Sequence, residues 1–347
     1  MSRIESSAAD RPTRRTAAGS LSLMKALPAA VTVAVAALAL RRYLSGRDGL
    51  SAVPAELRSP LLPMLAVDTT TRSLKVTRLA GRIPIPPGAG VTLAKRVVAG
   101  RLVLVLTPTN RSSAAVLYIH GGGMVVGSPQ SEIRGSAALA RALGAVVVSP
   151  DYRLAPEDPF PAGLDDCMAT LYWIRDNAAE LGIDPDRIAV TGSSAGGGLT
   201  AAVAQRAHDE GIRLRAQAMA YPMIDDRTVL RGDHDGRGRF LWTPASNRLG
   251  WTAYLGRPPR EADAPEYAAP ARRENLSGLA PAWIGVGDLD LFYDESVDYA
   301  ERLTAAGVEC ELVTVPGMYH GADGVAAKVP AMQAFRSSLM EHLRSHL

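Results

Sequence analysis

Beyond residue 100 the chain alternates short β-branched, apolar runs with longer stretches of helical periodicity. This alternation is typical of a largely parallel sheet covered by helices, because parallel neighbours need crossover connections. Strands are expected at 101–106, 115–119, 145–149, 188–192, 216–221, 282–287 and 309–315. Helices are expected at 131–143, 163–180, 196–209, 295–306 and 331–347. Ligands of such sheets bind beyond the carboxyl ends of the strands, so functional residues are expected in the loops there.

Other parts of the chain have different patterns. Residues 1–25 read as a flexible basic leader, residues 26–44 as an apolar helix, and residues 45–99 as a proline-rich linker and cap with one short helical pattern at 55–66. The sheet domain is expected to occupy 100–347. The alternation stops at about 223–280, where tryptophans lie among prolines and arginines. We expect this excursion to cover the strand ends as part of the cap.

Residues 26–40 carry no charge and lie between Lys25 and the pair Arg41-Arg42. As a helix this run would span about 22 Å, which is short of a hydrocarbon core of roughly 30 Å. Three interpretations stay open: a membrane anchor lengthened by snorkelling of the flanking basic residues, a helix packed on the protein, and a cleaved signal peptide. The expected location is therefore membrane-associated or cytoplasmic, with secretion the less favoured alternative.

The composition excludes several classes of protein. With 47% hydrophobic and 21% charged residues, the chain is neither disordered nor a polytopic membrane protein. A net charge of +3 with dispersed basic residues argues against nucleic-acid binding. Cys167 and Cys310 stand far from any metal-binding motif and read as buried free thiols, so neither a disulfide framework nor a metal site is expected.

The sharpest local signal is the segment 192–196, Gly-Ser-Ser-Ala-Gly, which follows an expected strand and opens an expected helix. This context is that of a nucleophile elbow, in which a tight strand-to-helix turn holds the central side chain out at the sheet edge. Only Ser194 has glycines two positions before and after it. Ser194 is therefore the candidate nucleophile, and a glycine-rich helix N-terminus that binds an anion is the alternative.

A second signal, His120-Gly121-Gly122-Gly123, follows the expected strand 115–119. Glycines leave backbone N–H groups unobstructed, and such donors stabilise the negative charge that develops during acyl transfer. Gly121, Gly122 and Ala195 are the candidate oxyanion-hole donors. We expect His120 to have a structural role in holding this loop.

The general base is selected by chain order, because the histidine of this arrangement lies on a loop after the last strand. His320 satisfies this condition, whereas His208, His342 and His346 lie on expected helices and read as solvated surface residues. The acid that orients the histidine is expected after the strand 282–287. Four carboxylates lie there: Asp288, Asp290, Asp294 and Glu295. Asp290 is the first candidate and Asp288 the second, and the others read as helix-capping groups.

With these residues assembled, residues 100–345 resemble the hormone-sensitive-lipase-like family of α/β-hydrolases, the bacterial carboxylesterases with an HGGG motif. The segment 151–157, Asp-Tyr-Arg-Leu-Ala-Pro-Glu, matches a family signature. Residues 290–295 match the family block that carries the acid, which favours Asp290, and residues 320–322 match its closing histidine block. The chain departs from the family at Ser193, Asp158 and Ala322.

The resemblance implies an α/β-hydrolase fold with a helical cap, and a serine carboxylic-ester hydrolase in which Ser194, His320 and Asp290 act without metal or organic cofactor. The expected substrates are small-molecule or lipid esters with short to medium acyl groups. An amidase or peptidase of the same fold and a non-catalytic ligand-binding homologue are the alternatives. The sequence leaves the oligomeric state open.

Overall fold

The computed structural model describes residues 43–44, 47–65 and 68–347. The leader 1–25 and the apolar run 26–40 lie outside the described residues. Across the ranges that are described, no helix combines the length and the apolar character needed to cross a membrane.

The centre of the molecule is an eight-stranded sheet with the order β1-β2-β4-β3-β5-β6-β7-β8. The strands are β1 (Val91–Val98), β2 (Arg101–Pro108), β3 (Ala115–Ile119), β4 (Val146–Pro150), β5 (Ile188–Ser193), β6 (Gln217–Ala220), β7 (Ala282–Gly287) and β8 (Cys310–Val315). Strands β3 to β8 pair in parallel, and β1 and β2 are antiparallel to their neighbours. This confirms the expected largely parallel sheet, and it places the loops after β3, β5, β6, β7 and β8 at one edge.

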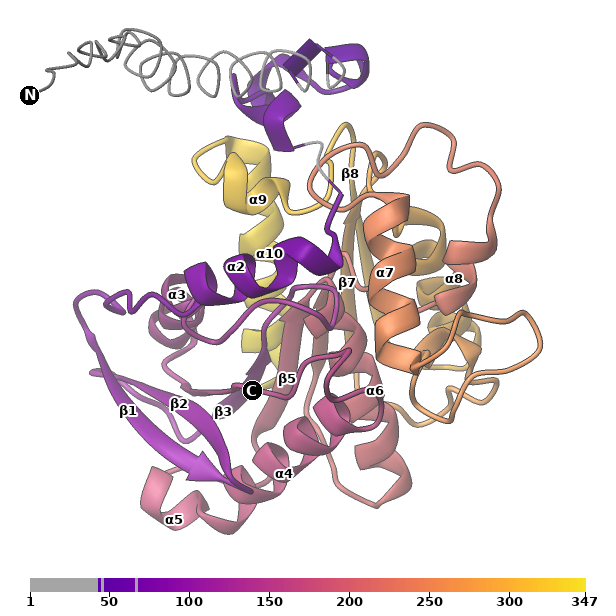
Figure 1. Cartoon of the computed structure of the whole chain (residues 1–347). Helices are drawn as coiled ribbons and strands as arrows, with labels where there is room; N and C mark the ends of the chain where they lie inside the picture. The colour runs from indigo at the N-terminus through magenta and orange to yellow at the C-terminus, as the bar shows by residue number, and fades with distance from the viewer. Residues whose placement is uncertain (1–42, 45–46, 66–67) are drawn as a thin grey trace, which may run out of the picture.

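Among the strands that the structure describes, β1 alone was not revealed by the sequence pattern. It lies at an edge of the sheet (Figure 1), and most of its side chains are exposed or half-buried. An edge strand with so little burial lacks the apolar run on which the prediction depended. The sheet therefore begins at Val91, within the segment that the sequence assigned to linker and cap.

Helices cover both faces of the sheet. On one face α3 (Ile133–Leu143) and α10 (Pro330–His346) contact each other and share an apolar core with the sheet. On the other, α4 (Ala162–Asp176), α6 (Ala195–Asp209) and α8 (Tyr293–Ala305) pack against the strands. The remaining α-helices of the described part are α2 (Thr71–Gly81), α5 (Ala178–Leu181), α7 (Pro244–Leu255) and α9 (Ala322–Val325). The two covered faces confirm the expected α/β architecture, a mostly parallel sheet flanked by helices.

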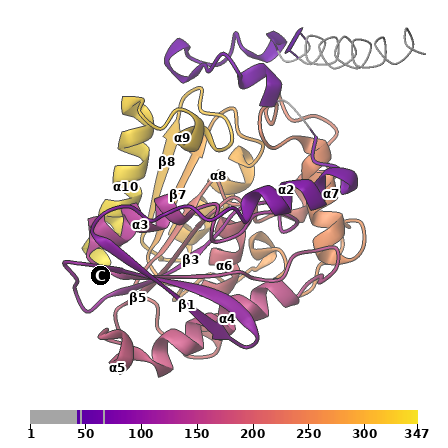
Figure 2. The same ribbon diagram turned by 60° about the vertical axis from the view of Figure 1, so that its left-hand side comes forward.

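The segment 55–66 does not form the expected helix. Two short 3₁₀-helices replace it, η2 (Ala55–Leu57) and η3 (Leu62–Leu65). Pro60 and Pro63 explain the difference, since proline lacks an N–H and clashes with the preceding turn of an α-helix. The regular helix of this region is α2, which starts with a capping box formed by Thr70 and Ser73 and lies between α3 and α7 in two views (Figures 1 and 2).

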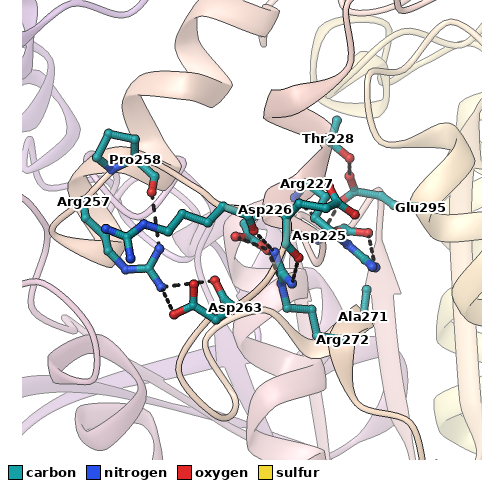
Figure 3. A network of polar contacts seen from close by, with 12 residues as sticks. Asp225, Asp226, Arg227, Thr228, Arg257, Pro258, Asp263, Ala271, Arg272 and Glu295 are labelled. Carbon is teal, nitrogen blue, oxygen red and sulfur yellow. Dashed lines mark hydrogen bonds and ion pairs between the residues drawn. The ribbon is translucent and has the colours of Figure 1, made fainter.

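The excursion between β6 and β7 contains η4 (Asp226–Leu230), α7 and η5 (Pro270–Arg272). A polar network joins its two ends (Figure 3). The Asp226 carboxylate is fully buried and pairs with Arg272 of η5 at 2.6 Å. Glu295 of α8 accepts hydrogen bonds from the N–H groups of Ile224 and Asp225. These contacts fix the excursion to the sheet domain where it leaves and where it returns.

Candidate active site

Ser194 lies at the turn between β5 and α6, with φ 55° and ψ −122°. This strained conformation is that of a nucleophile elbow, and tight packing maintains it. A Cβ atom on Gly192 would lie 2.4 Å from the carbonyl oxygen of Gly196, and one on Gly196 would lie 2.1 Å from that of Ile119 in β3. Glycine is therefore required on both sides of the serine. The N–H of Ser194 also donates to the carbonyl of Ala220 in β6 (2.9 Å).

The structure brings Ser194 together with the two other residues proposed for the triad. Nε2 of His320 lies 2.9 Å from Oγ of Ser194, and Nδ1 of His320 lies 2.9 Å from Oδ2 of Asp290. The other oxygen of Asp290 accepts the N–H of Phe292 (2.9 Å). Ser194 and His320 are each 7% exposed, and Asp290 is completely buried. The histidine is thus hydrogen-bonded on both ring nitrogens, as general-base catalysis by a Ser–His pair requires.

Two aromatic rings hold the His320 imidazole from its sides. Tyr221 lies edge-on to it with ring centroids 4.8 Å apart, and Phe292 does so at 5.3 Å. The hydroxyl of Tyr221 donates to Asp323 (2.8 Å). The sequence analysis did not predict that Tyr221 packs against His320. A usable signal was present, because Tyr221 follows β6 directly, at the edge where the ligand site was expected.

Asp288, the second candidate for the acid, does not reach His320. Its Oδ1 accepts the N–H of Gly317 (2.6 Å), and so it holds the loop that carries the histidine. Of the other histidines, His208 is exposed as expected, but His342 is 5% exposed. The expectation for His342 was wrong, because this side of α10 packs against the sheet and contributes to the core there.

The contacts of the glycine loop after β3 correct the prediction that Gly121 is an oxyanion-hole donor. The N–H of Gly121 already donates to Oε1 of Glu132 (2.9 Å), so it is not available to a substrate oxygen. Gly122 and Gly123 follow with φ of 123° and 60°, and neither N–H donates a hydrogen bond to another described residue. Together with the N–H of Ala195 at the start of α6, these two groups are the available donors.

His120 supports the loop, as the sequence suggested. Its ring stacks on Tyr152 with centroids 4.1 Å apart, and its Nδ1 lies 2.8 Å from the carbonyl oxygen of Gly121. Burial lowers the pKa of His120 to about 4, so the ring is neutral at pH 7. A carbonyl can only accept, which places the proton on Nδ1.

Trp242 of the excursion also contacts the glycine loop. A Cβ atom on Gly123 would lie 1.9 Å from the six-membered ring of Trp242, so the indole rests directly on the glycine. Trp242 is also 6.4 Å from His320 between ring centroids, and its Nε1 donates to Asn247 of α7 (3.3 Å). The sequence marked the excursion as a cover, but gave no signal that this tryptophan would contact the glycine loop.

No metal-binding arrangement accompanies these residues. Among the residues that the structure describes, no group of three His, Cys, Asp or Glu side chains is placed to hold a metal ion. Both thiols are free in this part of the chain, and burial raises the pKa of Cys310 to about 12.

Comparison with known proteins gives a consistent result. A family model for the α/β-hydrolase fold matches residues 116–323. The carboxylesterase NlhH of Mycobacterium tuberculosis is 43% identical over 230 residues, which cover 62% of this chain and 68% of the relative. The esterase LipI of the same organism is 37% identical, covering 65% of this chain and 70% of LipI. Among solved structures, a bacterial heroin esterase superposes with a TM-score of 0.78 at 34% identity, covering 86% of this chain and 99% of that one.

Proposed function

The chain belongs to the α/β-hydrolase fold family, within its hormone-sensitive-lipase-like carboxylesterases, and is a serine carboxylic-ester hydrolase; we propose that Ser194, His320 and Asp290 perform its reaction. The observation that carries this assignment is the continuous chain of hydrogen bonds from Ser194 Oγ through His320 to Asp290. That chain provides an activated nucleophile at the strand edge where ligands of such sheets bind.

In the proposed mechanism, Oγ of Ser194 attacks the ester carbonyl carbon while Nε2 of His320 removes the hydroxyl proton. Asp290 holds the imidazole in the tautomer with its proton on Nδ1, and its charge stabilises the imidazolium that forms. His320 then returns the proton to the oxygen of the departing alcohol, and an acyl group remains on Ser194. A water molecule, activated by the same histidine, hydrolyses this acyl-enzyme.

We assign the oxyanion hole to the N–H groups of Gly122, Gly123 and Ala195. Support comes from the N–H groups of Gly122 and Gly123, which donate to no other residue that the structure describes, and from the N–H of Gly121, which donates to Glu132. Each such donor typically contributes about 10²–10³ in rate, since it acts on charge that develops only in the transition state.

For the substrate, we propose a small ester with a short to medium acyl group. Support comes from Trp242, a bulky side chain that rests on Gly123 and lies near His320, beside the proposed oxyanion donors. We further propose that the region before β1 and the excursion 223–280 form one cap over the site. They are joined by hydrogen bonds from the N–H of Thr69 to Ser246 (2.8 Å) and from the N–H of Leu241 to the carbonyl of Leu65 (3.0 Å).

Attachment to a membrane through residues 26–40 is a separate proposal, and it rests on the sequence alone. The uncharged run between Lys25 and Arg41 is short for a spanning helix, so flanking basic residues would have to reach the interface. Fractionation of cells, with sequencing of the mature N-terminus, separates an anchored chain from a processed one. Recovery of the intact chain in the soluble fraction would overturn the proposal.

The test of the catalytic assignment is hydrolysis of p-nitrophenyl esters from acetate to palmitate by the wild type, Ser194→Ala and His320→Ala. The wild type should turn over the short esters, and each variant should lose about 10⁴–10⁶ in kcat at unchanged circular dichroism. Activity retained by Ser194→Ala would overturn the triad. A wild type inert on all esters would favour a ligand-binding homologue, and faster cleavage of matched p-nitroanilides would favour an amidase.

A further inference from the structure

The peptide groups around Gly121 are held by three side chains. The carbonyl of His120 accepts the hydroxyl of Tyr152 (3.0 Å), and the N–H of Gly121 donates to Oε1 of Glu132 (2.9 Å). The carbonyl of Gly121 accepts Nδ1–H of His120 (2.8 Å). Both polar groups of Gly121 are therefore directed away from the site by partners within the protein.

This arrangement determines where the next donor points. In a trans peptide the C=O and N–H groups point in opposite directions, so fixing the carbonyl of Gly121 also fixes the N–H of Gly122. Glycine has no side chain to restrict its backbone, and Gly122 and Gly123 adopt φ values of 123° and 60°. The direction of the proposed oxyanion donors thus depends on anchors outside the glycine run.

Glu132 is well suited to be such an anchor, because it is fixed at both its backbone and its carboxylate. Its carbonyl accepts the N–H of Ser136 in the first turn of α3 (3.0 Å). Its Oε2 accepts the hydroxyl of Tyr118 from β3 (2.7 Å), which leaves Oε1 for Gly121. The carboxylate therefore connects a helix, a strand and the loop.

The contact is close to the nucleophile as well. A Cβ atom on Gly121 would lie 3.0 Å from the carbonyl oxygen of Ser193 and 3.5 Å from Oε1 of Glu132. Gly121 is thus packed between the residue before the nucleophile and the carboxylate. Glu132 and Ser193 both line a pocket of about 700 Å³ that also includes Tyr118 and Tyr221.

We propose that Glu132 is a positioning residue for the oxyanion hole: it holds the N–H of Gly121 and so fixes the peptide from which the glycine run starts. The next two peptides, which carry the N–H groups of Gly122 and Gly123, are then set by Nδ1–H of His120 and by the N–H groups of Val125 and Val126 on the carbonyl of Gly122. Glu132 touches no reacting atom. This inference rests on the proposed serine mechanism and adds to it a carboxylate that neither the elbow nor the glycine motif contains.

An acceptor atom, rather than a negative charge, is what this role requires. Burial raises the pKa of Glu132, while the hydrogen bonds from Tyr118 and Gly121 act in the opposite direction. A glutamine in its place keeps an oxygen for the N–H of Gly121 and an N–H₂ group that can donate to the Tyr118 oxygen. The Gln variant should therefore retain the position of the loop, and the Ala variant should lose it.

The experiment compares Glu132→Ala and Glu132→Gln with the wild type on p-nitrophenyl butyrate. We expect the Ala variant to lose about 10- to 100-fold in kcat, with KM within about twofold, because a small displacement of catalytic donors weakens only transition-state binding. The Gln variant should stay within about threefold of the wild type. Glu210→Ala is the matched control, since Glu210 also accepts a tyrosine hydroxyl, that of Tyr172, but lies at the far end of α6.

A second measurement separates positioning from loss of structure. An alkyl trifluoromethyl ketone accepts Oγ of Ser194 at its carbonyl carbon, the serine proton passes to His320, and the ketone oxygen becomes an oxyanion in the hole. Its inhibition constant should rise in Glu132→Ala by about the factor lost in kcat/KM. If the Ala variant fails to fold, Glu132→Asp takes its place, because it retracts the carboxylate by one methylene. It should show a smaller loss of kcat and a correspondingly smaller rise in the inhibition constant.

Several results would overturn the inference. These are an unchanged kcat in Glu132→Ala, a rise in KM alone, and an equal loss in Glu132→Gln, which would assign the effect to charge. Failure of the proposed serine mechanism gives a different result, because Ser194→Ala would then remain active whichever residue stands at position 132.

Discussion

The loop after β7 and the start of α8 are adjacent in the chain, and each contributes a carboxylate that is almost fully buried. Asp290 is 0% exposed and Glu295 is 2% exposed. Asp290 bonds to the imidazole of His320, whereas Glu295 bonds to the N–H groups of Ile224 and Asp225 and to the hydroxyl of Thr228. In the proposed mechanism the partner of Asp290 gains and loses a proton, whereas the partners of Glu295 keep theirs.

This difference shows that burial alone does not identify a catalytic carboxylate. A buried acid that faces a general base, as Asp290 does in the proposed mechanism, contributes to the reaction, since it stabilises a charge that appears only during turnover. A buried acid that faces backbone N–H groups contributes to folding, since those groups would otherwise be unsatisfied. Glu295 therefore fixes the beginning of the excursion (Figure 3), and Asp290 fixes the base. Substitutions at the two positions should have opposite profiles.

The largest effect is expected for Asp290→Asn. The amide can keep the hydrogen bond from Phe292 but favours the wrong histidine tautomer, so kcat should fall by about 10⁴. The free energy of unfolding should change by less than about 1 kcal/mol. Steady-state kinetics and urea unfolding measure the two quantities. A variant that keeps a tenth of the wild-type kcat would place the acid elsewhere, with Asp288 the next residue to replace.

Glu295→Ala should give the reverse profile. Removing the carboxylate leaves two buried N–H groups and a hydroxyl without an acceptor, which should cost about 2–4 kcal/mol in the free energy of unfolding. The kcat per folded molecule should stay within about threefold of the wild type. Glu295→Gln is the control, because its amide oxygen still accepts the N–H groups. A large loss of kcat without loss of stability would remove the distinction between the two regions.

The pH dependence of stability provides a smaller, signed effect. Burial, and next the charge of Asp225, raise the pKa of Glu295 well above its usual range. The unfolded chain then loses this proton at lower pH than the folded protein, so the wild type loses stability as the pH rises above the ordinary glutamate pKa. The slope for one such group is at most about 1.4 kcal/mol per pH unit. Urea unfolding between pH 4.5 and 8 should show this slope in the wild type relative to Glu295→Gln. Parallel curves would contradict the shift itself, and a slope in the opposite direction would contradict its sign.

The parts of the site that sequence predicts are those specified by local pattern and chain order. The elbow around Ser194 is a contiguous motif, and His320 and Asp290 follow strands whose apolar runs are recognisable. In a parallel sheet these positions meet at one edge, so the three residues can be assigned without coordinates.

The parts that sequence missed depend on side chains from distant segments. Glu132 reaches Gly121 because α3 starts beside β3, and Trp242 reaches Gly123 because the excursion folds back over the site. No periodicity encodes such contacts. The same limit explains the error at Gly121, where three successive glycines look equivalent in sequence but one N–H is taken by a carboxylate. Strand β1 was missed for another reason, since an edge strand buries too little to show an apolar pattern.

The smallest effect is expected for Asp294→Asn. This variant tests whether a carboxylate must be buried to contribute strongly to the free energy of unfolding. Asp294 bonds to Arg231 at 2.7 Å and to Arg237 at 2.8 Å, but its side chain is 42% exposed. Exposed ion pairs contribute about 0–1 kcal/mol, because water solvates both charges when the pair is broken. The free energy of unfolding should therefore fall by less than about 1 kcal/mol, and the difference should shrink in 1 M NaCl, where charges are screened within about 3 Å. A loss of stability as large as that of Glu295→Ala, and unaffected by salt, would show that the number of partners decides how much a carboxylate contributes to the free energy of unfolding. The expected result would show that desolvation decides the contribution to stability, since among the described residues Asp294 has two charged partners and Glu295 has none.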